Sequence, residues 1–244
     1  MPITSYSTYL DKGAEGLLLP YPDHDIIGSL YGYFNADSGR LPYGRLVADK
    51  GSTAGGVGLP TKTSATLRGF TYYQALDQAD YNTLENGIVA LEPVALVREG
   101  LLLVLPETNI TKGSEIYLRC ILNATLGTYE ALGRIRGDAD NITISNVALT
   151  SNVATITAVA HGLTVGQVVT IAGLTTTALN GTYTVVSTPT VDTFTFAKTN
   201  ANISSSADSG TIARAMALSD KFLRIALVES AVAGVPCYLD FELK

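Results

Sequence analysis

Residues 153–173 read VATITAVAHGLTVGQVVTIAG, and this stretch decides the fold class. Thr, Val and Ile dominate both of its ends, and these β-branched residues favour strands. The middle, residues 160–166, carries two glycines and is typical of a turn. We therefore predict two short strands, at residues 152–159 and 167–171, joined by that turn.

The same Thr- and Val-rich composition continues to residue 214. Residues 179–185 (LNGTYTV) carry Asn-Gly, which is a tight-turn signal. Residues 192–196 (DTFTF) alternate as a strand does, and residues 210–214 (GTIAR) end the segment. Strands spaced about ten residues apart are typical of a small sandwich or barrel. Strand-like sequence of a different composition resumes afterwards. We therefore predict that residues 146–214 form a small antiparallel β domain inserted into a larger one.

Residues 26–145 and 215–244 are predicted to form that larger, main β domain, with a barrel-like or sandwich-like fold. In residues 116–120 (IYLRC), Ile116, Leu118 and Cys120 should share a covered face. Tyr117 and Arg119 should then lie on the other, uncovered face. Residues 1–25 have no clear period and are predicted to be an extended N-terminal arm.

Other elements of the main domain follow from shorter patterns. We expect strands at 43–48, 67–73, 222–228 and 237–243, breaks at Pro93 and Gly100 within the apolar run 88–105, a hairpin-like stretch at 125–136 and a short helical turn within 74–86. The fold class predicted for the whole chain is all-β.

Charge and hydropathy argue against two classes of partner. Only 16% of the 244 residues are charged, the net charge is -6, and Lys and Arg form no basic stripe. Nucleic-acid binders need such a stripe for the phosphates, so we expect no nucleic-acid partner. No apolar run approaches the ~20 residues that span a bilayer, and no signal peptide is visible, so we expect no membrane partner and synthesis in a cytoplasm.

The cysteines and glycosylation motifs predict no special chemistry. Cys120 and Cys237 lie in apolar, strand-like runs and are expected to be buried free thiols. Five Asn-x-Ser/Thr motifs occur, at Asn109, Asn123, Asn141, Asn180 and Asn202. Without a secretory signal they are chance products of an Asn- and Thr-rich sequence.

Three patterns suggest catalysis or ligand binding, and each has a simpler interpretation. His24 lies between Asp23 and Asp25, but adjacent residues of an extended chain point in different directions, so we expect a solvated turn. His161 is expected to stabilise the turn that it occupies. The glycine-rich residues 51–58 (GSTAGGVG) lack the Gly-Lys-Ser/Thr of a phosphate loop and are expected to be a flexible loop.

Paired carboxylates could cleave glycosidic bonds, but Asp77, Asp80 and Glu85 fit a polar helical face. We therefore predict no catalytic, cofactor-binding or metal-binding residues, no cofactor, and a protein that is not an enzyme. Two aromatic clusters, one at residues 31–43 and one at residues 70–73, suit a core and an interface equally well.

Two parts of the sequence resemble known protein families, and these resemblances imply a function. Residues 153–214 resemble the short β module common in phage structural proteins, through VATITAVAHGLTVGQVVTIAG, LNGTYTVVS, DTFTF and GTIAR. This resemblance implies a virion or prophage setting and no catalysis.

The rest of the chain resembles the head cement, or decoration, proteins of tailed bacteriophages. The stretches that carry this resemblance are LPYGRLVA (41–48), GVGLPTKTSATLRGFTYY (56–73), VALVREGLLLVL (94–105), KGSEIYLR (112–119), LGRIRGDAD (132–140), and RIALVES (224–230) with DFELK (240–244). The family implies a homotrimer on the outer surface of the capsid. There it would bind the major capsid protein and cement neighbouring subunits against the pressure of packaged DNA.

Two rival functions remain at this point. A phage tail or baseplate component, or a host-surface binding protein, could carry the same β module. The chain lacks the long fibrous repeat that would favour it. The second rival is a virion-borne polysaccharide hydrolase.

Overall fold

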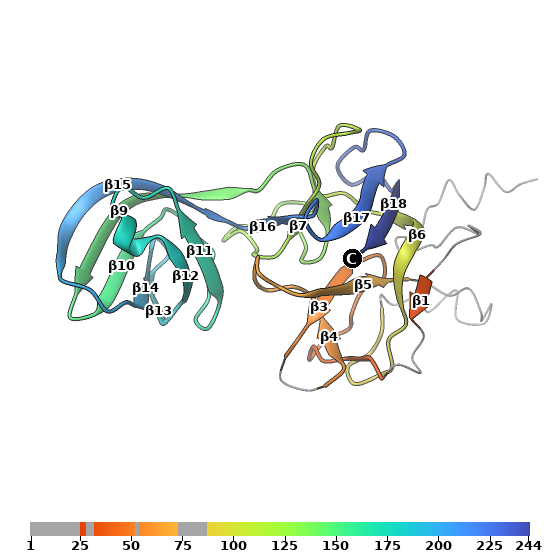
Figure 1. Ribbon diagram of the computed structural model, residues 1–244, viewed down its shortest axis with the longest axis horizontal. Helices are drawn as coiled ribbons and strands as arrows, with labels where there is room; N and C mark the ends of the chain where they lie inside the picture. The colour runs from red at the N-terminus through yellow and green to blue at the C-terminus, as the bar shows by residue number, and fades with distance from the viewer. Residues whose placement is uncertain (1–24, 28–31, 52–53, 73–86) are drawn as a thin grey trace, which may run out of the picture.

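The computed structural model describes residues 25–27, 32–51, 54–72 and 87–244 (Figure 1). Residues 1–24 of the predicted N-terminal arm, His24 among them, and the predicted helical turn at 74–86 lie outside these residues, together with Asp77, Asp80 and Glu85. The described chain is nearly all β, as the sequence predicted. It forms two lobes joined by a narrower neck (Figure 1).

The main lobe is built on an eight-stranded sheet. Its strands run in the order β17-β18-β6-β5-β3-β4-β2, and β1 also pairs with β6. Their bounds are β1 (Asp25–Ile27), β2 (Phe34–Asn35), β3 (Leu46–Asp49), β4 (Gly56–Gly58), β5 (Leu67–Thr71), β6 (Leu96–Val104), β17 (Phe222–Leu227) and β18 (Cys237–Leu243).

Strand β18 shows why this sheet has a core on one face. Its buried residues alternate with half-buried ones, as the period of two predicted. Phe241 packs against Phe70 with ring centroids 4.7 Å apart and against Phe222 at 6.2 Å. Phe70, from one of the two aromatic clusters, is therefore a core residue.

The second lobe is a barrel. A seven-stranded antiparallel sheet runs in the order β12-β11-β15-β9-β10-β14-β13. Its elements are β9 (Asn141–Thr150), β10 (Val153–Thr157), β11 (Val168–Ala172), the 3-10 helix η2 (Thr177–Leu179), β12 (Gly181–Thr184), β13 (Ser187–Thr190), β14 (Thr193–Ala197) and β15 (Ile203–Ala213).

Closure of the barrel comes from one bent segment. β12 pairs with β11, and β13, only two residues further on, pairs with β14. At the bend, Val186 donates its backbone N–H to the carbonyl of Thr195 (2.8 Å). Counting β12 and β13 as one strand gives a barrel of six strands. Alternate residues fill its interior, for example Ile142 and Ile144 of β9.

A three-stranded sheet, β16-β7-β8, lies between the lobes. It consists of β7 (Tyr117–Arg119), β8 (Ile135–Arg136) and β16 (Ala215–Ala217). β7 pairs with both of the others. The predicted division into an N-terminal arm, a main domain and an inserted domain stays a prediction.

Three local predictions need correction. Residues 56–58 of the glycine-rich stretch form the buried strand β4, because they pair with β2 and β3. Gly100 does not break β6, which runs through it in register with Phe241. Residues 125–136 form turns and the short β8 instead of a hairpin, since the Glu130 carboxylate accepts N–H groups from Asn123 and Gly127. The turn predicted at Asn180-Gly181 lies where η2 ends and β12 begins.

Candidate functional site: the neck between the two lobes

The neck is the part of the molecule that fixes one lobe against the other. We define it as the three-stranded sheet, the loops at residues 105–107 and 120–130, the connection at residues 137–140 that leads into β9, and the barrel turn at residues 160–167. Both chain crossings between the lobes pass through it (Figure 1). Its main feature is a buried cluster of charged side chains.

Three arginines of this cluster come from three neighbouring strands. Arg119 ends β7, Arg136 ends β8, and Arg214 directly precedes β16. Because β7 pairs with both β8 and β16, the three guanidinium groups gather in one place. Their mutual repulsion in a buried setting has to be offset by carboxylates.

Arg119 is the centre of the cluster. Its Nη2 lies 2.7 Å from Oε1 of Glu107, and its Nε donates to both carboxylate oxygens of Glu107 at 3.0 and 3.1 Å. Its Nη1 donates to Asp140 and, at 3.0 Å, to the carbonyl of Ile121. The side chains of Arg119 and Glu107 are only 2% and 4% exposed, so water screens this pair very little.

Asp140 ties the other two arginines to Arg119. Its carboxylate lies 3.3 Å from Nη1 of Arg136 and 3.7 Å from Nη1 of Arg214. Asp140 has a φ of +46°, in the left-handed region, and its N–H donates to Asp138 Oδ1 at 3.0 Å. Asp138 in turn pairs with Arg136. The first residue before the barrel is therefore held on the three-stranded sheet by charge.

Burial has opposite effects on the two partners of the central pair. It raises the pKa of Glu107 to about 7, although the charge and hydrogen bonds of Arg119 act against this rise. Burial lowers the pKa of Arg119, but the neighbouring carboxylates Glu107 and Asp140 outweigh it, so that the net shift is upward. Arg119 therefore stays charged. The cluster holds the strands and loops of the neck together through ion pairs and hydrogen bonds.

This burial corrects the prediction for residues 116–120. The alternation indicated that Arg119 lies on an uncovered face, but the side chain is almost completely buried. The reason is that the loops carrying Glu107 and Glu130 fold over that face of β7. Sequence reasoning missed the cluster, although YLR, RIR and IAR each end an apolar run with arginine, and these are the three arginines that meet.

The barrel turn docks directly on the main lobe. A Cβ atom on Gly162 would lie 2.6 Å from the backbone nitrogen of Ala124 and 2.7 Å from the carbonyl oxygen of Leu122. Arg214 adds hydrogen bonds from Nη2 to the carbonyls of Ala160 (3.1 Å) and His161 (3.3 Å). The lobes are therefore joined by a close backbone contact as well as by the two chain crossings.

His161 stabilises this turn, as predicted. Its Nδ1 accepts the N–H of Leu163 at 2.9 Å, and its ring meets Phe194 edge-on with centroids 5.5 Å apart. The residue is only 2% exposed, and its Nε2 has no hydrogen-bond partner among the residues that the structure describes.

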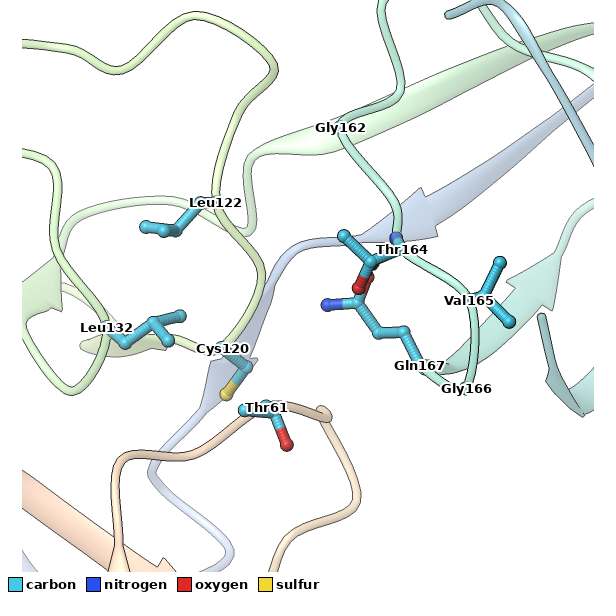
Figure 2. A pocket seen from close by; sticks show the side chains of 9 residues that line it. All are labelled: Thr61, Cys120, Leu122, Leu132, Gly162, Thr164, Val165, Gly166 and Gln167. Carbon is cyan, nitrogen blue, oxygen red and sulfur yellow. Dashed lines mark hydrogen bonds between the residues drawn. The ribbon is translucent and has the colours of Figure 1, made fainter. Parts of the chain in front are cut away.

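Gly162 lines two cavities. One, of about 330 Å³, is lined by Thr61 of the main lobe, by Cys120, Leu122 and Leu132, and by the barrel turn at residues 162–167 (Figure 2). Figure 2 shows the Cys120 sulfur directed toward Thr61. Burial raises the pKa of Cys120 to about 12, so its thiol is not a nucleophile near neutral pH.

The other cavity is an open groove of about 410 Å³. Its walls are Ala124, the turn residues 161–163 and residues 188–191 at the end of β13. Within the described part of the chain, no acidic side chain and no Lys or Arg lines it.

Of the two cysteines, Cys120 lies in the neck and Cys237 begins β18 of the main lobe. Cys120 and Cys237 are both buried free thiols, which confirms that prediction. Within the described ranges, no three or more His, Cys, Asp and Glu side chains gather to hold a metal ion. In the same ranges, no helix is long and apolar enough to cross a membrane.

The described residues thus form two β lobes joined by a neck with a buried charged cluster, which is the arrangement of a structural protein. Comparison with known proteins identifies the family. Residues 1–160 match the model of the family described as "Structural cement protein (E217 gp24/Pam3 gp6)". This is more than half of the chain, and the chain therefore belongs to the structural cement protein family of phages.

A search of solved structures found a looser likeness. A chain of the structure titled "The capsid of Myoviridae Phage XM1" is 12% identical, with a TM-score of 0.38. The likeness covers 75% of this chain and 88% of that chain. No curated protein matches. Family membership makes the chain a structural protein of a phage particle, as its sequence predicted.

Proposed function

We propose that this protein binds the outside of the phage head and cements neighbouring major capsid subunits against the internal pressure of packaged DNA. The observation that carries the proposal is the neck. A chain with two lobes can contact two neighbouring subunits, and it resists their separation only if the lobes cannot swing apart. The buried cluster of Arg119, Glu107 and Asp140 supplies that stiffness.

Charge and composition support a place outside the shell. The net charge of -6 opposes contact with packaged DNA, whose phosphates attract basic surfaces. The barrel is nearly uncharged, with Asp192, Lys198 and Asp208 as its only charged residues between 141 and 213. Such a surface suits repeated contact with other proteins, because few charges lose their water on binding.

The oligomer is part of the proposal. We infer that the main domain, residues 26–145 and 215–244, contacts the capsid, and that the chain forms a homotrimer. Several modest contacts in one oligomer would make release slow, because each contact raises the effective concentration of the others. The proposed action is mechanical and requires no catalysis or cofactor.

Heads that lack this protein provide the test. Purified protein is added back to such heads, and the bound copies are counted against the major capsid protein by quantitative mass spectrometry. Resistance of the heads to heating is measured in parallel. We expect a ratio near one to one and a higher temperature of DNA release. A ratio of a few per cent in native virions, with no gain in resistance, would overturn the proposal and favour a tail or baseplate role.

A further inference from the structure

We draw no further inference here: the strongest candidate, the uncharged groove at the barrel turn between Ala124, residues 161–163 and residues 188–191, carries none, because nothing in the structure shows what covers it.

Discussion

Arg119 Nη2 and Glu107 Oε1 lie 2.7 Å apart in the neck, and both side chains are almost fully buried. Arg119 comes from the strand β7, whereas Glu107 lies in the loop that follows β6 of the main sheet. This ion pair therefore joins the main sheet to the three-stranded sheet, which lies between the main lobe and the barrel. In the proposed cementing role, the resistance of the neck to bending would depend on this pair.

Replacement of Arg119 by alanine should be strongly destabilising. The change leaves the Glu107 carboxylate buried without its main partner, and breaking a buried pair in this way costs about 3–5 kcal/mol. The measurement is the free energy of unfolding in urea at pH 8. Arg224→Ala is the matched control, because Arg224 is 43% exposed and pairs with Glu99, Asp240 and Glu242 on the sheet surface. It should lose less than about 1 kcal/mol, and an equal loss in both variants would contradict the special role of the neck.

The free energy of unfolding should depend on pH because of Glu107. Its pKa is about 7 in the folded protein, against an ordinary value of 4.5, because burial disfavours the charged form. Between these two values the folded state holds more protons than the unfolded state. The contribution of Glu107 is thus fully present below pH 4.5 and is lost as the pH rises through about 7.

Comparison with Glu107→Gln isolates this contribution. The free energy of unfolding of the unchanged protein, minus that of the variant, should fall by up to about 1.4 kcal/mol per pH unit across this range and level off above it. Urea unfolding of both proteins at half-unit steps of pH provides the measurement. A difference that stays constant, or that grows as the pH rises, would show that burial does not control this carboxyl.

The two cysteines should be inert in the folded protein. Burial raises the pKa of Cys120 and of Cys237 to about 12, so almost no thiolate is present at pH 8. A chromogenic disulfide reagent should therefore label both thiols at the rate of unfolding, and at once in urea. Ser151→Cys, at an exposed turn, is the positive control. Rapid labelling of the unchanged protein would show that one of the thiols is accessible.

The sequence predicted the barrel better than the neck, and the reason is physical. Each barrel strand carries its own signal, because inward residues such as Phe194 and Phe196 alternate with Thr along a few positions. Three of the six strand pairings in this sheet also join consecutive strands, as β9 does with β10. Local patterns are then enough to indicate the fold class.

The neck depends instead on residues far apart in the sequence. Arg119 and Arg214 are neighbours only because β7 pairs with β16, and nothing near either residue indicates that pairing. The alternation around Arg119 predicted exposure because it reports one strand and not the loop that covers it. The groove was missed for the same reason, since Ala124, Gly162 and Val191 meet only through the folded turn.

The contact between the two lobes can be tested most directly at Gly162. Its φ is +65°, and a Cβ atom there would lie within 2.6–2.9 Å of backbone atoms of residues 122–124, which cannot move aside as a flexible side chain can. Gly162→Ala should therefore destabilise the protein by about 2–4 kcal/mol, from backbone strain and overpacking together.

Gly166→Ala is the matched control in the same turn, because its φ is +84° and nothing lies within 4 Å of the added carbon. It should show only the strain, about 1 kcal/mol. Thermal and urea unfolding of both variants measure the difference. Equal losses would mean that the barrel turn does not rest on the main lobe, and the stiffness of the neck would then depend on the charged cluster alone.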